Sequence, residues 1–507
     1  MDTVNTEKTG EGLIYQYAAN ITITLSGMFF YLYTIHYFSP NVVGLFSLLL
    51  AIASLFNIIF SFGFPPAVSH FISYSIGKRY PGDIRKIIKS TIKFGLFLSL
   101  ISLLFVLIFS NYISDLFFHG EYSFYLKLIS VDIFIMILNN FLISVLYGLQ
   151  KFKYVSIFQS IGNVFSYFSG FIIYHFIPNL YLIVIGWIIG NSIIMVFSAV
   201  LILIYSGNIE ATELKEYSLK KMMNYAIPIY ASSILGYGAT YMDRFVVSYF
   251  LNLTEFGIYT LAILMVTSFS FVQGPINNVL LPKFSKFFGE NDYYSLKLYS
   301  SKAFLYVLII SVSLTFIVAS LSSWIIIFIS NSEYLSATIP FIIISLSESL
   351  SLTTSVISSG IQSIRKNRIF VLSSALGILT NVVLSFMLIP HLRLIGAAIA
   401  FSSSLIVNFI IILVYAMKLN IFKLYHLKVF KTYVAGTLTF LIIFYIQEKL
   451  KFSVIKLFSL IILSFIIYII LIRILKILEK EDMEIINSIT PEKLKSVVRI
   501  LERIILS

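Results

Sequence analysis

The chain has 507 residues, of which 59% are hydrophobic and 12% are charged, and its mean hydropathy is +0.94. A soluble domain carries about 25% charged residues, so this composition excludes a water-soluble protein. The chain has no cysteine, which excludes disulfides and thiolate metal sites. The formal charge of +13 lies in short Lys and Arg clusters between apolar runs, as in the loops of a membrane protein, and does not indicate nucleic-acid binding.

Fourteen apolar segments are long enough to cross a bilayer core, which needs about 20 residues per helix. They span residues 13–37, 42–75, 90–110, 124–148, 154–177, 180–205, 223–250, 256–281, 303–329, 337–360, 369–389, 394–417, 429–447 and 453–475. We expect Gly63-Phe64-Pro65-Pro66 to break or kink the second, which is longer than one span requires. The predicted fold is an all-α polytopic membrane protein with about 14 transmembrane helices.

The positive charges predict the orientation. With the N-terminus on the inner side, the inner loops hold 21 Lys and Arg residues, whereas the outer loops hold only Arg393, Lys449, Lys451 and Lys456. By the positive-inside rule, both termini are therefore cytoplasmic and the protein is a multi-pass protein of the plasma membrane. Loops on both sides are too short for a folded domain, so the activity is expected within the membrane.

The segment after Leu475 is different. Thr490-Pro491 predicts a helix start, and apolar residues then recur at helical spacing among Lys and Arg up to Ile505. This pattern predicts a basic amphipathic helix, which would either lie on the inner leaflet or cap the protein's own cytoplasmic face. The sequence leaves both alternatives open.

An internal repeat divides the chain. Gly148-Leu149-Gln150 matches Gly360-Ile361-Gln362 at a shift of 212, and the same shift carries Ile177-Pro178 onto Ile389-Pro390. The repeat predicts lobes of six helices at 1–206 and 223–417, an inter-lobe linker at 207–222, two extra helices at 418–475 and a cytoplasmic tail at 476–507. Parallel repeats with a substrate site at their interface are a known transporter plan, although duplication also makes inert scaffolds.

These halves resemble a known family. The residues that carry the resemblance are Tyr241-Met242-Asp243-Arg244-Phe245, Phe256-Gly257-Ile258-Tyr259-Thr260-Leu261-Ala262, Gly360-Ile361-Gln362, and Ile389-Pro390 with Gly396-Ala397-Ala398. Over roughly residues 10–475 the chain resembles the polysaccharide transporter (Wzx-type flippase) branch of the multidrug/oligosaccharidyl-lipid/polysaccharide (MOP) exporter superfamily.

The resemblance implies a MATE-like, V-shaped pair of lobes that alternates between inward-open and outward-open states. It also implies that a polyprenyl- or dolichyl-(pyro)phosphate-linked oligosaccharide is flipped from the cytoplasmic to the outer leaflet. The implied partners are this cargo, membrane lipids and glycan-assembly enzymes, and the implied state is a monomer. Lipid II flippases of the superfamily carry arginines in the first helix, whereas residues 13–37 contain no Lys or Arg, so lipid II is not the expected cargo.

Charges inside apolar segments mark candidate sites, because each costs about 2.5–3.5 kcal/mol on insertion. Glu348, Asp132 and Asp243 are candidates for binding a coupling H⁺ or Na⁺, since a desolvated carboxylate exchanges protons closer to neutral pH. Asp132 shares a predicted helix face with Asn139 and Asn140, at i+7 and i+8. The alternative is a carboxylate that is hydrogen-bonded between helices and serves packing only.

The substrate candidates are one cation and several amides. Arg244 would bind a phosphate through its planar fork, unless it snorkels or forms an interhelical ion pair. Amides donate and accept, which suits sugar hydroxyls, although interhelical hydrogen bonds explain them equally well. The candidates are Asn20, Asn139, Asn140, Gln273, Asn277, Asn278 and Asn381. No catalytic residue, metal site or cofactor is expected.

Two other functions remain open. A drug or cation antiporter of the related multidrug (MATE) branch typically has twelve helices, and the additional pair within 429–475 argues against it. A membrane-embedded polymerase or glycosyltransferase would need an acidic cluster at the outer surface. The longest outer loop offers only Asp115 and Glu121. We therefore expect a transporter and not an enzyme.

Overall fold

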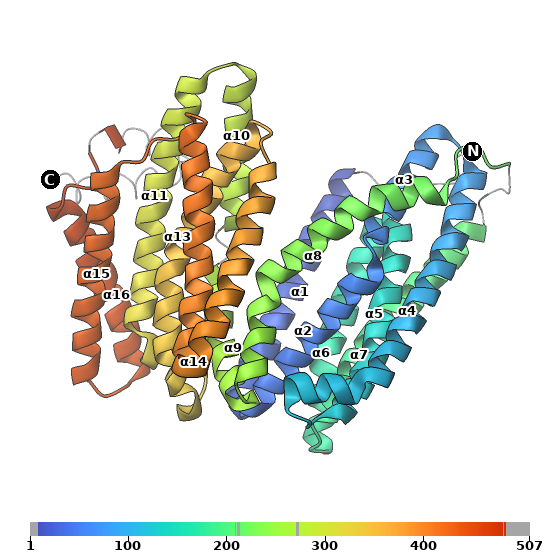
Figure 1. The fold of residues 1–507 in the computed structure, drawn as a ribbon, viewed down its shortest axis with the longest axis horizontal. Coiled ribbons are helices and arrows are strands. Elements are labelled where there is room, and N and C mark those ends of the chain that lie inside the picture. The colour runs from blue at the N-terminus through green and yellow to red at the C-terminus, as the bar shows by residue number, and fades with distance from the viewer. Residues whose placement is uncertain (1–8, 208, 210–212, 270–272, 480, 483–507) are drawn as a thin grey trace. The chain divides into compact units, whose positions relative to one another are not determined.

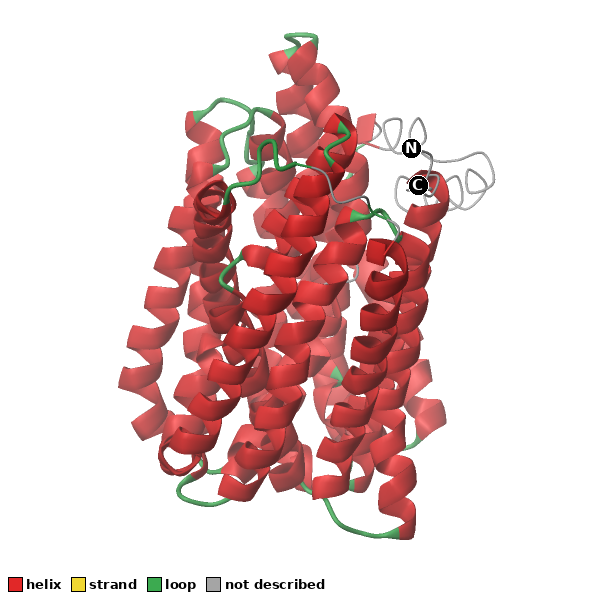
Figure 2. Cartoon of the chain, turned by 90° about the vertical axis from the view of Figure 1, so that its right-hand side faces the viewer, coloured by secondary structure: helices red, strands yellow, loops and turns green. Residues whose placement is uncertain are grey.

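The computed structural model describes residues 9–207, 209, 213–269, 273–479, 481 and 482, and over these it consists of helices joined by short loops (Figure 2). The helices are α1 (Thr9–Tyr37), α2 (Pro40–Ser61), α3 (Phe64–Lys78), α4 (Pro81–Phe118), α5 (Ser123–Gly148), α6 (Phe152–Phe176), α7 (Tyr181–Gly207), α8 (Leu219–Phe250), α9 (Leu253–Thr267), α10 (Gln273–Gly289), α11 (Tyr293–Ser320), α12 (Ser322–Ile329), the 3₁₀ helix η2 (Ser332–Ala337), α13 (Thr338–Ser363), α14 (Arg368–Lys418), α15 (His426–Lys449) and α16 (Val454–Ile474). The amphipathic helix predicted after Thr490 lies outside the described residues.

The prediction of an all-α polytopic membrane protein is confirmed. Within the described residues, ten helical segments are long and apolar enough to cross a membrane, one of them being the 51-residue α14. Large apolar side chains remain exposed on them, including Ile108 (73%) and Ile455 (79%), as expected of surfaces that face lipid. All fourteen predicted segments are helical over most of their length, but a count of fourteen spans stays a prediction.

Four predicted segments are divided or joined differently in the structure. The predicted helix 256–281 is two helices, α9 and α10, and Pro275 in the first turn of α10 cannot continue a preceding helix because it lacks the backbone donor. The predicted helix 303–329 is also two, α11 and α12, which meet at Leu321. The predicted segments 369–389 and 394–417 form the single helix α14, which has a break at Arg393 (φ 49°, ψ −125°).

The chain forms two compact units, Met1–Thr254 (unit 1) and Glu255–Ser507 (unit 2). In Figure 1, the helices of unit 1 run from blue to green and those of unit 2 from yellow-green to red. Helix α8 belongs to unit 1, where it packs against α2, α3 and α4. Its Tyr237 and Tyr230 hydroxyls donate to the backbone oxygens of Ala51 (2.5 Å) and Ile59 (3.2 Å) on α2. The sequence repeat assigns α8 to the second lobe, so the packing boundary and the repeat boundary differ by this helix, and the predicted domain boundaries stay predictions.

Helix ends of the two units resemble each other in the way the repeat predicts. Arg79 and Asn291, which follow the ends of α3 and α10, are 212 positions apart, and both adopt the left-handed conformation. Gln150 and Arg365 do the same after α5 and α13, but 215 positions apart. In each case the next residue donates back five positions into the helix, which closes its last turn. Helix α13 therefore runs three residues further than the predicted shift of 212 would place its end.

Gly63 explains the break between α2 and α3. It has φ +62°, and the preceding Phe62 has φ 50°, so two left-handed residues end α2. A Cβ at Gly63 would lie 2.6 Å from the backbone oxygen of Ala226 on α8. Only glycine combines this conformation with such close contact to a neighbouring helix. The break that the Gly63-Phe64-Pro65-Pro66 sequence predicts is therefore confirmed.

Small residues pack α6 against α7. Gly162, Ser166 and Gly170 recur every four residues on α6 and contact Gly186 and Gly190 on α7. A Cβ on Gly186 would lie 2.5 Å from the backbone nitrogen of Gly170. In lipid, helices associate mainly through close van der Waals contact, which small residues permit. These residues hold the helix that carries Asn191, a partner of the candidate site.

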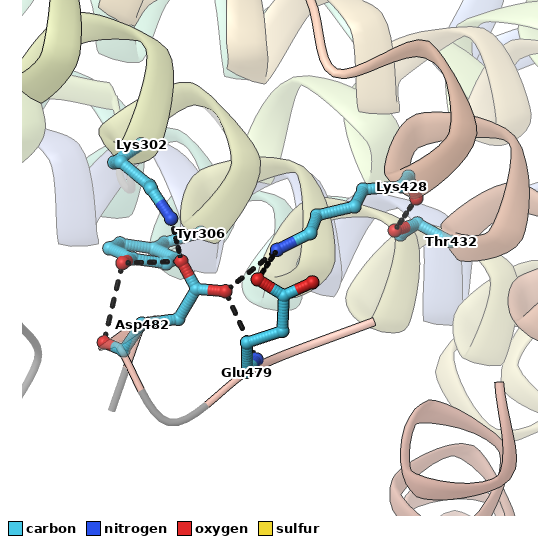
Figure 3. Close-up of polar contacts among 6 residues, drawn as sticks. All are labelled: Lys302, Tyr306, Lys428, Thr432, Glu479 and Asp482. Carbon is cyan, nitrogen blue, oxygen red and sulfur yellow. Dashed lines mark hydrogen bonds and ion pairs between the residues drawn. The ribbon is translucent and has the colours of Figure 1, made fainter. Parts of the chain in front are cut away.

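In unit 2, a cluster of charges joins the segment after α16 to α11 and α15 (Figure 3). The Asp482 carboxylate pairs with Lys302 on α11 and, at 2.9 Å, with Lys428 on α15. Tyr306 on α11 also donates to Asp482 (3.3 Å), and Glu479 pairs with Lys428 (3.2 Å). Asp482 is fully buried, so this cluster ties the end of the described chain to unit 2.

Candidate functional site

Asp132 lies in a buried polar network within unit 1. It is 1% exposed on α5 and accepts a hydrogen bond from the side-chain nitrogen of Asn191 on α7 (2.9 Å). Asn139, also on α5, donates to the backbone oxygen of Asn191 at 2.9 Å. Asp132 and Asn139 therefore share a helix face, as predicted, and Asn191 connects them.

Asn140 does not belong to this network, which corrects the prediction that all three residues share a face. Its side chain donates to the Asn57 side-chain oxygen on α2 (2.8 Å), and Asn57 also accepts from Ser61 (3.3 Å). Consecutive helical residues point about 100° apart, so residue 140 faces α2 whereas residue 139 faces α7. The contacts of Asn139 with Asn191 and of Asn140 with Asn57 are both interhelical hydrogen bonds within unit 1.

Arg244 and Asp243 lie on α8. Asp243 is buried (4% exposed), whereas Arg244 is half-buried with its guanidinium carbon 4.4 Å from the centroid of the Tyr241 ring. The Tyr237 ring stacks on Tyr241 with centroids 4.7 Å apart, and Arg244 also interacts electrostatically with the hydroxyls of Tyr237 and of Tyr31 on α1. The guanidinium therefore lies among tyrosines contributed by two helices.

Glu348 is 7% exposed on α13 and accepts a hydrogen bond from Ser351, one turn further along the same helix. The Ser351 hydroxyl in turn accepts from the side chain of Gln273 on α10 (3.3 Å). Asn277, one turn along α10, accepts from Ser359 (2.9 Å). Two of the predicted amides thus meet the serine-rich face of α13 that carries Glu348.

This face lines a cavity of about 300 Å³ within unit 2. Its walls come from α10, α13 and both segments of α14. The lining residues are Gln273, Asn277, Ser351, Thr354, Ser355, Ser358, Phe370, Ser373, Ser374, Leu405, Asn408 and Ile412. Nine of these side chains are polar and none is charged, so the cavity suits an uncharged polar ligand.

The remaining predicted amides do not join either network. Asn20 is exposed on α1. Asn381 is buried in α14 and accepts from Ser385 of the same helix (3.4 Å), which indicates a packing role. The side chain of Asn278 lies outside the described part of the structure. Within the described residues, no three His, Asp or Glu side chains gather in a way that could hold a metal ion.

Sequence reasoning missed Asn191, Asn57 and Asn408. Each is an amide inside an apolar segment, which is the signal that singled out the other amides, and Asn408 lies in the predicted segment 394–417. It also missed that Lys302 and Lys428, counted among the inner-loop cations, are ion-pair partners of Asp482. Their partner lies in the tail, beyond the apolar segments.

Comparison with known proteins identifies the family. The sequence pattern of the family described as polysaccharide biosynthesis protein matches residues 9–288, which is more than half of the chain. No curated protein matches the chain.

Among solved structures, the lipid II flippase MurJ in an inward closed conformation is 17% identical, with 91% of this chain and 98% of that chain covered and a TM-score of 0.65. An inward-facing multidrug resistance MATE family transporter of the MOP superfamily is 14% identical, with 78% of this chain and 94% of that chain covered and a TM-score of 0.66. At these identities the likeness shows the fold. The chain belongs to the polysaccharide biosynthesis protein family, and its fold resembles that of these two membrane transporters.

Proposed function

We propose that this chain is a membrane transporter of the polysaccharide transporter branch of the MOP superfamily, and that it flips a polyprenyl- or dolichyl-(pyro)phosphate-linked oligosaccharide from the cytoplasmic to the outer leaflet by alternating access. Its family and its membrane fold support transport as the activity. The observation that carries the phosphate-linked cargo is the environment of Arg244. It is a half-buried cation within a helix, and such a charge needs a function or a partner.

The setting of Arg244 suits a phosphate. A guanidinium that stacks its flat face on a tyrosine keeps its N–H groups, which lie in its plane, directed outward. Those groups match two oxygens of one phosphate. A cationic drug would be repelled by the same group, so Arg244 favours a lipid-phosphate cargo over the cationic substrates of a multidrug antiporter.

Buried carboxylates supply the ion coupling in this proposal. Glu348, Asp132 and Asp243 are each less than 10% exposed, and each sits within a helix. When such a carboxylate gains or loses a proton, or binds Na⁺, the charge in its low-dielectric surroundings changes. This change can favour one conformation of the protein over another. Glu348 is the foremost candidate, because its partner Ser351 lines the cavity of unit 2.

The orientation follows from the distribution of Lys and Arg. Both termini would be cytoplasmic in the plasma membrane, with the cargo taken from glycan-assembly enzymes on that side. The protein would act as a monomer, since each chain carries both units.

Reconstituted vesicles test this proposal. The purified chain is inserted in liposomes with a polyprenyl-pyrophosphate-linked N-acetylglucosamine, and galactosyltransferase outside the vesicles reports sugar that reaches the outer leaflet. We expect wild type to translocate the probe faster in an H⁺ or Na⁺ gradient, and Glu348→Gln to lose this acceleration while its unfolding temperature is unchanged. Glu333→Gln is the matched control, because Glu333 is an exposed carboxylate of the same unit.

Two outcomes would contradict the proposal. If folded wild type moves the probe no faster than empty vesicles, the lipid-linked cargo is wrong. If wild type instead exchanges a cationic dye for protons and ignores the probe, the multidrug alternative is correct. Wild-type acceleration in Glu348→Gln would remove Glu348 from the coupling step.

A further inference from the structure

The cavity of unit 2 is chemically unlike the surroundings of Arg244. It is lined by six hydroxyls, three amides and three apolar side chains, whereas Arg244 in unit 1 offers a cation. We propose that this cavity is a sugar subsite, which binds one uncharged sugar residue of the cargo and does not bind its phosphate. This inference rests on the proposed function, because it assumes that the cargo carries a glycan.

The hydroxyls in the cavity are mainly acceptors. Thr354 and Ser355 donate to the backbone oxygens of Leu350 and Leu352, both at 2.7 Å, and Ser373 donates to that of Phe370 at 3.2 Å. A hydroxyl whose hydrogen bonds back to its own helix keeps oxygen lone pairs for a ligand. Such a lining favours a ligand that brings many O–H donors, as a sugar does.

The amides supply the donors that a sugar also needs. Asn277 accepts from Ser359 through its side-chain oxygen, so its nitrogen is the atom that can donate into the cavity. Asn408, on the second segment of α14, directs its nitrogen toward the Ser373 hydroxyl at 3.5 Å, a distance at which a ligand oxygen competes readily. A lining that offers acceptors on α13 and α14 and donors on α10 and α14 matches hydroxyls that both donate and accept.

An anion fits poorly. The ionised diester phosphates of a lipid-linked sugar bring only acceptors, and no Lys or Arg lines the cavity. The Glu348 carboxylate is hydrogen-bonded to Ser351, a residue of the cavity wall. Its negative charge would repel a phosphate in the cavity.

Size limits the ligand to a single ring. Ligand cavities usually hold about 300–1,000 Å³, so this one is at the lower end and too small for an oligosaccharide. Phe370, Leu405 and Ile412 form an apolar part of the wall, against which the C–H face of a pyranose can pack. The rest of the cargo would remain outside the subsite.

The absence of cysteine from the chain makes a direct test available. Ser358, a half-buried lining residue of α13, is replaced by cysteine in the full chain in lipid nanodiscs, and its rate of alkylation by a small neutral maleimide is measured. The probes are glucose, galactose, mannose and N-acetylglucosamine, with inorganic phosphate and Na⁺ for comparison. At a sugar concentration twice its Kd, occupancy of one site slows alkylation about threefold.

We expect at least one neutral sugar to slow alkylation of Ser358→Cys, and phosphate and Na⁺ to leave the rate unchanged. Ser90→Cys, at a half-buried position on α4 of unit 1, is the control. Its rate of alkylation should be the same with every probe and without any probe. Adding Asn408→Leu to Ser358→Cys should abolish the protection by sugar while alkylation without sugar continues, which shows that the cavity still forms.

Protection by none of the four sugars overturns the subsite, and so does equal protection by phosphate or protection by Na⁺ alone. The vesicle assay separates this inference from the proposed function. If wild type flips the lipid-linked probe but no sugar protects, only the subsite is wrong. If a neutral sugar protects but no probe is flipped, the subsite is supported and the proposed function falls.

Discussion

The side-chain nitrogen of Asn191 donates a 2.9 Å hydrogen bond to the Asp132 carboxylate, and this bond joins α7 to α5 inside unit 1. A buried carboxylate must keep its hydrogen-bond partners, because an isolated charge or polar group in a dry interior is costly. The bond is compatible with both alternatives for Asp132, ion coupling and packing. Substitution of the two partners separates the alternatives.

Asn191→Leu should lower the stability of the folded protein. It removes the donor and leaves the Asp132 carboxylate buried, which costs about 1–3 kcal/mol or more for a charged group. The measurement is the unfolding temperature in detergent micelles. Asn20→Leu is the control, because Asn20 is an exposed amide on α1 and should be close to neutral.

The double variant Asp132→Leu/Asn191→Leu should regain most of this stability. Because both hydrogen-bond partners are replaced by apolar side chains, no buried carboxylate is left without a donor. If its transport in vesicles also equals that of wild type, Asp132 serves packing only. Loss of ion-driven transport in this folded variant would assign the coupling role to Asp132. Wild-type stability of Asn191→Leu would show that the bond contributes nothing.

Gly63→Ala should destabilise the protein by at least about 2 kcal/mol, because it places an L side chain at φ +62° and drives a methyl group into the Ala226 backbone oxygen. Gly236→Ala is the matched control. Gly236 is in the interior of α8 with nothing within 4 Å of its ideal Cβ, so alanine should stabilise by about 0.5–1 kcal/mol. We expect Gly63→Ala to lower the unfolding temperature and Gly236→Ala to raise it. Equal shifts in the two variants would contradict the requirement for glycine at position 63.

The sequence predicts the helices of this protein well because bilayer thickness sets the length of apolar segments. The break at Gly63 was also predictable, since Gly and Pro act on the local backbone. Gly274-Pro275, in the first turn of α10, carries the same signal, and the separation of α9 from α10 was missed. The pattern Gly162, Ser166, Gly170 was equally readable and predicts a close helix contact, though not that its partner is α7.

The sites were less predictable, because they depend on how helices face one another. Asp132 and Glu348 are marked by their charge inside apolar segments. Asn191, the partner of Asp132, lies 59 positions away in the sequence, and Gln273, which donates to the Ser351 partner of Glu348, lies 75 positions from Glu348. Which amide meets which side chain of another helix depends on the rotation and shift of the packed helices. For the same reason Asn139 and Asn140, adjacent in sequence, contact different helices.

Asp482→Asn should weaken the attachment of the segment after α16. Burial raises the pKa of the Asp482 carboxyl, but hydrogen bonds from Lys302 and Lys428 outweigh it, so the pKa lies below its ordinary value of 3.8. A carboxyl with a lowered pKa in the folded state contributes stability that is complete well above pH 3.8 and is lost as the pH falls through the folded-state pKa. The variant should therefore unfold at a lower temperature than wild type at neutral pH.

The difference in unfolding temperature between wild type and Asp482→Asn should shrink as the pH falls below 3.8. Glu290→Gln is the control. Glu290 forms an exposed ion pair with Lys286 at 3.8 Å, and surface pairs contribute only about 0–1 kcal/mol. A difference that persists unchanged at acid pH would show that the carboxylate charge does not stabilise the cluster.

Arg244→Lys should slow translocation of the lipid-linked probe, even though the positive charge is kept. Lysine is a point charge without the planar fork, so it cannot stack on Tyr241 and bind two phosphate oxygens together. Losing one charge-assisted hydrogen bond of about 1.5–3 kcal/mol should lower the rate about ten- to hundredfold.

Arg368→Lys, at an exposed position where α14 begins, is the control for Arg244→Lys and should keep the wild-type rate. Wild-type translocation in Arg244→Lys would mean that only the charge matters and that the fork does not hold the phosphate. A lower unfolding temperature with an unchanged rate would assign Arg244 to packing among the tyrosines. A lower rate with an unchanged unfolding temperature is the result that the stacked geometry predicts, because the substitution then removes contacts to the cargo and none that the fold requires.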